Sequence, residues 1–520
     1  MSAHTFNYVI YIGASAAEVW DALTSENLTA KFWGHSNVST WEPGEPWKHV
    51  RTDGSDISDV VGRVVESERP GRLAITFSGP DETAAQEPLV TFTIEEYQDI
   101  VFWTPQTAPD RVAVQEEVAA AFTAETGIGV EVVPLAAADQ NQALVTGAAS
   151  GDVPDVILLG TTQVDNFRTQ GLLDSEAAAA IVDELGPDTF NGPALAAFSA
   201  DGEVGAVPSD GWVHLIAYRT DLYEAAGLEV PGSLEELAEA ATTLKESQGV
   251  TGIALGTQSG TASGTEAIYS MFQSNGCELV EDGTVTIDSA ACTEAAELFL
   301  ELRNSSIAGD FDVLSARAAY FAGQAGMLLF STHLLDELAG LDPANPATCA
   351  ECAGDPGFLA ENTGFITVLD EDHPAQYGAT LGYAIPTGAN TTEASMFIEY
   401  LLSDGYIDTL GMATEGRIPL RNGTADNPTE FLDAWAELGM GPDKSISPAE
   451  VYGEDFIGSL AEGMNAVHIW GAGTPDALLV GTVSSQGTLA GFLERLYAGE
   501  DPATVTEEMK RAVEEVQSSL

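Results

Sequence analysis

Basic residues are scarce in this chain. Its 520 residues include 18 Lys and Arg against 81 Asp and Glu, which gives a formal net charge of −63 at pH 7. Binding to nucleic acid or to an anionic membrane surface needs clustered Lys and Arg, so the charge argues against both kinds of partner. Such an acidic, solvated surface favours the hypothesis of a high-salt habitat, because screening relieves the self-repulsion.

Long apolar runs are also absent. No stretch approaches the ~20 consecutive apolar residues of a transmembrane helix, whereas a hydrophobic fraction of 44% is typical of a globular chain. The first residues, MSAHTFNYVIYIGAS, lack the basic region, apolar run and cleavage site of a signal peptide. No export signal is therefore predicted in this segment, and retention in the cytoplasm remains an alternative.

The short motifs of common catalytic sites are missing as well. The sequence contains no G-x-S-x-G, no H-E-x-x-H, no phosphate-binding P-loop and no G-x-G-x-x-G. We therefore predict no catalytic residue, no metal site and no cofactor. Pairs of acids such as Glu235 and Glu236 keep a glycoside-acting hydrolase open as an alternative, because glycosidases use two carboxylates.

Only four cysteines are present, in two close pairs. Cys277 and Cys292 flank a predicted hairpin with Asp282-Gly283 at its turn. Cys349 and Cys352 form a C-x-x-C motif in a loop. An even number of cysteines is typical of disulfides in an exported protein, and we predict one in each pair. A metal or redox role for the second pair remains open.

The first hundred residues predict a small α+β domain. Ser15 and Glu18 form a capping box that opens a helix, and alternating apolar residues predict strands at 5–12, 59–67, 72–78 and 88–96. The motifs YIGASAAEVWDALT, WEPGEPW, GRVVESERPGRLAITF and PLVTFTIEE resemble the START-like SRPBCC superfamily, in its heat-shock-chaperone-activator-like branch. The resemblance implies a helix-grip fold and a domain at residues 1–98.

That family closes an apolar cavity with further strand and a long C-terminal helix. The chain instead runs on after Glu96 into a segment of another kind, so the N-terminal domain is expected to be incomplete. A cytoplasmic START-like ligand-binding or chaperone-activating protein, with the remainder as an appendage, is the alternative function.

From residue 99 onward, strand and helix patterns alternate, which predicts an α/β fold. The segment 101–134 starts as an apolar strand and continues through a Pro-containing loop, an amphipathic helix and a second strand. Ligands bind at loops that follow the carboxyl ends of such strands. The first loop carries Trp103, Thr104 and Gln106, a combination that suits a polar, hydroxyl-rich small molecule.

Residues 99–520 resemble the extracellular solute-binding proteins of ABC transporters, of the maltose-binding type. The resemblance rests on several blocks in the same order, among them PDVILLG, VPSDGW, PGSLEELAEAATTL, FAGQAGM and EYLLSDGYID. It implies a second domain at residues 99–520 with two α/β lobes, joined by a hinge near Val207–Gly211.

The implied function is to bind a small polar solute, most simply a carbohydrate, between the lobes and to deliver it to ABC permease subunits. The protein would act outside the cytoplasm, as a monomer. By position, the family's cleft residues correspond to Trp103, Thr104, Gln106, Thr161, Thr162, Gln163, Asp210, Trp212, Ser331, His333 and Tyr383, with Trp470 as a late contribution.

Overall fold

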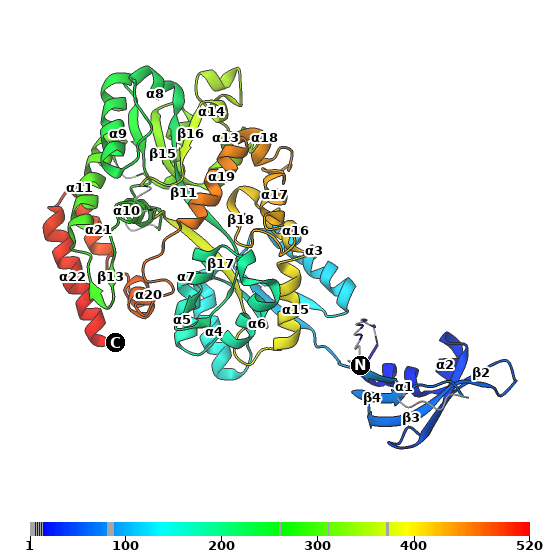
Figure 1. Cartoon of the computed structure of the whole chain (residues 1–520). Coiled ribbons are helices and arrows are strands. Elements are labelled where there is room, and N and C mark those ends of the chain that lie inside the picture. Colours follow the sequence, from blue (N-terminus) through cyan, green and yellow to red (C-terminus); the bar gives the residue numbers. More distant parts are fainter. Residues whose placement is uncertain are drawn as a thin grey trace. The chain divides into compact units, whose positions relative to one another are not determined.

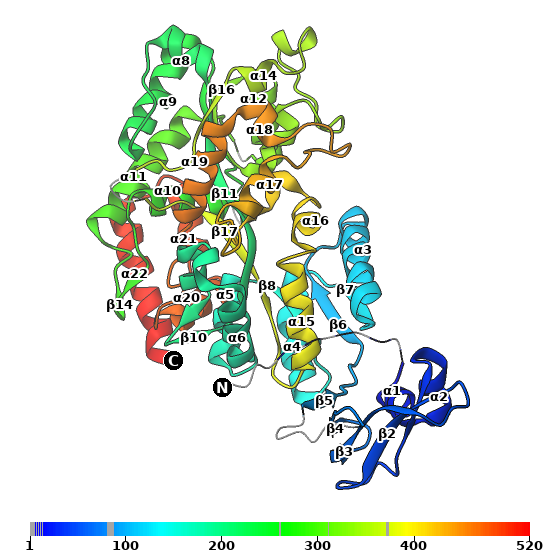
Figure 2. The ribbon, with the colours of Figure 1, turned by 45° about the vertical axis from the view of Figure 1, so that its right-hand side comes forward.

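The computed structural model describes residues 6, 8, 10, 12, 14–80, 88–258, 262–309, 311–370 and 374–520. The chain forms two compact units (Figures 1 and 2). The N-terminal unit comprises Met1–Asp99 with Ala120–Val130, and the large unit comprises Ile100–Ala119 with Glu131–Leu520. Within the described part of the chain, no helix is both long enough and apolar enough to cross a membrane.

The N-terminal unit contains a five-stranded antiparallel sheet in the order β1-β2-β3-β4-β5. Trp20 and Trp47 pack with Val64, Leu73 and Ile75 into its core. The elements are α1 (Ala16–Thr24), α2 (Glu26–Phe32), β1 (His35–Val38), β2 (Pro46–Arg51), β3 (Ser58–Glu68), β4 (Arg72–Thr76) and β5 (Leu89–Thr93).

The predicted helix start in this unit is confirmed. The Ser15 hydroxyl accepts a hydrogen bond from the Glu18 amide, and the Glu18 carboxylate accepts one from the Ser15 amide at 3.0 Å. The strands predicted at 59–67, 72–78 and 88–96 are β3, β4 and β5. The strand predicted at 5–12 lies largely outside the described residues.

A nine-stranded mixed sheet organises the large unit, with the main order β12-β15-β11-β17-β8-β6-β7 and with β16 and β18 both paired to β11. The buried run Asp155–Leu159, part of the PDVILLG block, forms most of β8. The strands are β6 (Ile100–Thr104), β7 (Val130–Pro134), β8 (Val156–Gly160), β11 (Val207–Arg219), β12 (Thr251–Ala254), β15 (Ala325–Ser331), β16 (Thr363–Ile366), β17 (Gly378–Ala384) and β18 (Ile418–Pro419).

Strand β11 is the backbone link between two lobes. Its first half pairs with β17, up to Val213 opposite Gly378, and its second half pairs with β15, from His214 opposite Ser331. Figure 1 shows helices gathered around each half. The predicted hinge at Val207–Gly211 lies in the first half of this strand.

Helices cover both lobes. The lobe at the start of β11 carries α3 (Pro109–Thr126), α4 (Ala137–Ser150), α5 (Thr161–Thr169), α6 (Ser175–Leu185), α7 (Gly192–Ala197), α15 (Thr391–Leu401), α16 (Tyr406–Leu410) and α17 (Glu430–Ala436). The other lobe carries α8 (Thr220–Ala226), α9 (Leu234–Gln248), α10 (Ala262–Ser274), α11 (Ala290–Ser305), α12 (Val313–Phe321), α21 (Ala490–Tyr497) and α22 (Pro502–Ser519).

Two further helices lie near the passage between the lobes. Helix α19 (Glu454–Asn465) packs on the middle of β11, where a Cβ on Gly211 would lie 2.7 Å from the Met464 methyl group. Helix α20 (Ala477–Ser485) contacts α5 of one lobe and α22 of the other. The two lobes therefore share β11 and these helices as common structure.

The predicted hairpin between Cys277 and Cys292 forms with β13 (Val280–Glu281) and β14 (Thr284–Val285). Asp282 and Gly283 both have positive φ, as the two central residues of a type I′ hairpin turn require. The sulfur atoms of Cys277 and Cys292 are bonded, with Cα atoms 4.6 Å apart, and those of Cys349 and Cys352 are bonded as well.

Candidate functional site

Four rings meet where β11 passes from one lobe to the other. Trp212 and His214 are two residues apart on β11, so their side chains lie on one face of the strand. The Trp212 ring centroid lies 5.5 Å from His214 and 6.2 Å from both His333 and Tyr377, and His214 lies 4.9 Å from Tyr377. We call Trp212, His214, His333 and Tyr377 the β11 aromatic cluster.

Neighbouring strands position these rings. The His214 amide donates a 2.8 Å hydrogen bond to the carbonyl of Tyr377, which directly precedes β17. His333 follows the end of β15, and its Nδ1 atom lies 3.3 Å from the Ser331 hydroxyl. The opposite face of β11 is covered by α19. Within the cluster, Trp212, His333 and Tyr377 are half-buried and His214 is buried.

Both imidazoles of the cluster are neutral at physiological pH. Burial, with a smaller contribution from the nearby His333, lowers the pKa of His214 to about 3. Burial also lowers the pKa of His333 to about 4, helped by the positive charges of Arg111 and Arg417. Each neutral ring offers one hydrogen-bond donor and one acceptor.

Acidic and basic groups border the cluster. A Glu266 carboxylate oxygen lies 4.0 Å from Nε2 of His214, and burial raises the pKa of Glu266. Arg111, at the start of α3, donates a 3.1 Å hydrogen bond to the Gln106 amide oxygen. This hydrogen bond links the first loop of the large unit, which carries Gln106, to Arg111, whose positive charge acts on His333.

The matches with known proteins agree with this architecture. The family described as bacterial extracellular solute-binding protein matches residues 104–407, more than half of the chain. This chain belongs to that family. A second family, described as Activator of Hsp90 ATPase homolog 1-like protein, matches residues 13–125.

Individual relatives extend the similarity over the solute-binding unit. The Escherichia coli protein YcjN, described as an ABC transporter periplasmic-binding protein, is 25% identical over 433 residues, which cover 80% of this chain and 92% of YcjN. The GacH receptor of Streptomyces glaucescens matches with 19% identity and a TM-score of 0.58, over 82% of this chain and 99% of its own. The cyclic alpha-maltosyl-1,6-maltose binding protein of Arthrobacter globiformis matches with 18% identity and a TM-score of 0.59, over 82% and 100%.

Both resemblances seen in the sequence are therefore confirmed. The N-terminal match continues past the expected boundary at residue 98 and overlaps the solute-binding match between residues 104 and 125. In the structure, β6 pairs in parallel with β8, Phe102 opposite Val156, so residues 100–104 belong to the large sheet.

Several predicted site residues remain accessible in the solute-binding unit. Trp103, Gln163, Ser331 and His333 are half-buried like Trp212, as is Gln106, and Thr162 is exposed. Only Trp212 and His333 belong to the β11 aromatic cluster, with Ser331 beside them. The Gln163 amide donates to the Ala137 carbonyl and to Asn141 at 3.1 Å each, so it holds α4 against the start of α5.

Two threonines predicted at the cleft are instead buried and used inside the lobe. The Thr104 hydroxyl accepts hydrogen bonds from the Gln106 amide at 3.2 Å and from the Gln115 side chain at 3.0 Å. The Thr161 hydroxyl, at the start of α5, lies 2.5 Å from that of Thr380 on β17. Each satisfies polar groups in the interior and has no surface for a solute in this conformation.

Asp210, also predicted at the cleft, is buried in this structure. Its carboxylate is fully buried, lies 2.8 Å from the Arg417 guanidinium and accepts a 2.7 Å hydrogen bond from the Ser209 hydroxyl. This buried ion pair holds the segment that contains β18 against β11. Removing one partner would lower the free energy of unfolding, because the other charge would stay buried without a partner.

Two aromatic residues predicted at the cleft, Tyr383 and Trp470, are buried as well. Tyr383 is 0% exposed and packs edge-on against Phe102, with ring centroids 6.0 Å apart. Trp470 is 6% exposed, stacks near Tyr269 and donates its indole N–H to the Cys277 carbonyl at 2.8 Å. Both side chains belong to the cores of their lobes.

Sequence reasoning missed His214, Tyr377, Glu266 and Arg111. The period of two along a strand would have placed His214 beside Trp212. Tyr377 directly precedes β17, but nothing in its sequence neighbours indicates that it meets β11. Glu266 and Arg111 come from helices of different lobes, and no local pattern links them to the cluster.

Proposed function

We propose that the solute-binding unit binds an uncharged carbohydrate at the β11 aromatic cluster. The observation that carries the proposal is a half-buried tryptophan, flanked by two neutral imidazoles and a phenol, at the strand that joins two lobes. Sugars present apolar C–H faces that stack on an indole and hydroxyl groups that bond to imidazole and phenol groups.

The relatives support this class of solute. The Arthrobacter relative is named for binding cyclic alpha-maltosyl-1,6-maltose, and the GacH receptor was solved in complex with acarbose and a homolog. The neutral imidazoles favour an uncharged ligand over a strongly ionic one, because they add no net charge to the site.

The same structure supports delivery to an ABC permease. Two lobes that share the long strand β11 can close by a hinge motion. Contacts with the solute then shift the balance between open and closed forms. A closed form presents a surface that differs from the open one, which a permease can distinguish. The matched family and YcjN are binding proteins and not enzymes, so we propose that the chain carries its solute unchanged and does so as a monomer outside the cytoplasm.

Trp212→Ala tests the proposed site. We expect it to weaken the binding of maltooligosaccharides by at least about tenfold, equivalent to ~1.4 kcal/mol, since it removes the stacking surface. Phe492→Ala on α21, another half-buried aromatic side chain, is the matched control and should leave binding unchanged. Calorimetric titration with a panel of neutral oligosaccharides measures both.

Unfolding in urea separates this loss from a loss of folding. A half-buried side chain should cost less free energy of unfolding than the ~3–5 kcal/mol of a core tryptophan. A Trp212→Ala protein that binds as tightly as the parent, or that loses stability on the core scale, would contradict the assignment.

A further inference from the structure

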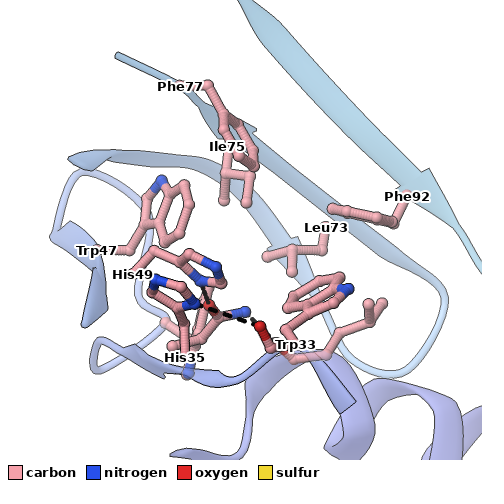
Figure 3. Close-up of a pocket in the computed structure, with 11 residues that line it drawn as sticks. Trp33, His35, Trp47, His49, Leu73, Ile75, Phe77 and Phe92 are labelled. Carbon is pink, nitrogen blue, oxygen red and sulfur yellow. Dashed lines mark hydrogen bonds between the residues drawn. The ribbon is translucent and has the colours of Figure 1, made fainter. Parts of the chain in front are cut away.

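The N-terminal unit contains a cavity of about 270 Å³ that the proposed transport function does not use. Its walls are mainly apolar, formed by Trp33, Trp47, Leu73, Ile75, Phe77 and Phe92 (Figure 3). Three polar side chains, His35, Asn37 and His49, lie together at one side of it on β1 and β2. An apolar cavity with a few convergent polar groups is the usual form of a small-molecule site.

The hydrogen bonds of His35 assign it a positive charge. Its Nδ1 atom lies 3.2 Å from the Trp33 carbonyl and its Nε2 atom lies 2.8 Å from the Asp59 carboxylate. A carbonyl and an ionised carboxylate can only accept, so both ring nitrogens of His35 must donate. Arg51 also donates two 2.7 Å hydrogen bonds to Asp59, and it keeps the pKa of that carboxyl low, with help from His35.

Hydrogen bonds also determine the tautomer of His49. The Asn37 side-chain amide donates to the Leu23 carbonyl at 2.9 Å, which identifies the other terminal atom of Asn37 as the acceptor oxygen. That oxygen lies 2.6 Å from Nδ1 of His49, so Nδ1 carries the proton. The remaining nitrogen, Nε2, then carries a lone pair that can accept a hydrogen bond in the neutral ring.

The two imidazoles stack almost in parallel. Their centroids are 4.3 Å apart and their planes differ by 4°, with His49 on the side of Trp47 and Ile75 (Figure 3). Burial and the charge of His35 both lower the pKa of His49. His49 therefore stays neutral, and within the described part of the chain its ring makes one hydrogen bond, from Nδ1 to the Asn37 oxygen, and none through Nε2.

We propose that this cavity binds a compact aromatic alcohol or phenol, whose hydroxyl group donates a hydrogen bond to Nε2 of His49. The aromatic walls take the ring of the ligand, and the acceptor selects for a hydroxyl over an ether. A carboxylate is disfavoured, because a neutral Nε2 has no proton to donate and both N–H groups of His35 are already used. This site is independent of the solute-binding cluster, since each lies in its own unit.

The test compares three bicyclic probes on the full-length protein at pH 7.5 by isothermal titration calorimetry. We expect 2-naphthol to bind about tenfold more tightly than 2-methoxynaphthalene, which has the same rings but no hydroxyl proton, since one hydrogen bond is worth about that factor. Naphthalene-2-carboxylate should bind more weakly than 2-naphthol. Equal affinities for naphthol and its ether, tighter binding of the carboxylate, or no binding of any probe would overturn the proposal.

His49→Phe provides the decisive variant, because it keeps a flat ring in the wall and removes the acceptor. The variant should bind 2-methoxynaphthalene as the parent does, which shows that the cavity still forms, and it should lose the preference for 2-naphthol. His468→Phe, in the large unit, is the matched control and should keep that preference. A tenfold preference that survives in His49→Phe, or loss of binding of the ether together with intact folding by circular dichroism, counts against the site.

Discussion

Individual side chains on β11 show how position along a strand determines role. Trp212 and His214 lie on the face that meets His333 and Tyr377, whereas Gly211 and Val213 lie under α19. The resemblance was enough to predict Trp212 at the cleft. It did not predict the burial of Asp210 two residues earlier, because a pairing with Arg417, more than two hundred residues away, decides that burial.

His214 should make the folded state sensitive to acid. Its pKa falls from 6.5 to about 3 on folding. Between those values the unfolded chain holds a proton that the folded chain lacks, so the stabilisation is complete above pH 6.5 and declines as the pH falls. The loss should approach about 1.4 kcal/mol per pH unit below 6.5.

Urea titrations between pH 7.5 and 5 test this against His214→Gln. The variant keeps the numerous acids of the chain and the neighbouring groups Glu266, His333 and Tyr377, so their contributions are shared. We expect its free energy of unfolding to fall less steeply with pH than that of the parent. Parallel pH profiles would show that His214 is not the group responsible.

At the scale of elements, local sequence motifs predicted where helices begin and where the chain turns better than they predicted where helices end. The capping residue Ser15 opens a helix where expected, and the Asp282-Gly283 turn forms the expected hairpin. The block EYLLSDGYID spans parts of two helices and the turn between them. It is divided into α15 and α16, since the chain turns at Ser403–Gly405, where the Gly405 amide bonds to the Tyr400 carbonyl.

The hairpin at β13 and β14 should owe part of its stability to the Cys277–Cys292 bond. The bond spans 15 residues and both sulfurs are buried in the core of the second lobe. The chain-entropy estimate for a loop of this length is roughly 3 kcal/mol. Replacing both cysteines with alanine should lower the free energy of unfolding of that lobe by about this amount, and sugar binding should persist.

Intact-protein mass spectrometry with and without alkylation measures whether the bond forms. Cys349→Ala/Cys352→Ala is a suitable comparison, because its bond spans only three residues and should constrain the unfolded chain less. If Cys277 and Cys292 stay alkylatable after exposure to air, or if both double variants lose equal stability, the assignment to the longer loop fails.

At the scale of the whole molecule, the sequence predicts two modules in a fixed order. Strand and helix blocks over residues 99–520 predicted the two-lobed architecture, because their order is preserved even where identity to relatives is below 25%. Contacts around the β11 aromatic cluster were less predictable. The residues come from α3 (Arg111), β11 (His214), α10 (Glu266) and the position before β17 (Tyr377), and only folding brings them together.

The junction between the modules is the least predictable part of the chain. The sequence places the boundary at residues 98 and 99, whereas the two family matches overlap and the compact N-terminal unit includes Ala120–Val130. We propose that the functional boundary lies just before β6, since Ile100–Thr104 is a strand of the large sheet.

Residues 99–520, expressed alone under oxidising conditions, should then fold and bind carbohydrate with the affinity of the full chain. All four rings of the β11 aromatic cluster and the strand β6 are retained in this segment. A chain that starts at residue 106 is the matched control. It lacks β6, which pairs with β8 through Phe102 and Val156, and it should lose stability because Phe102 is buried in the core. If instead the chain from residue 99 melts well below the full-length protein or binds sugar more weakly, then Ala120–Val130 depends on the N-terminal unit and the boundary must be moved.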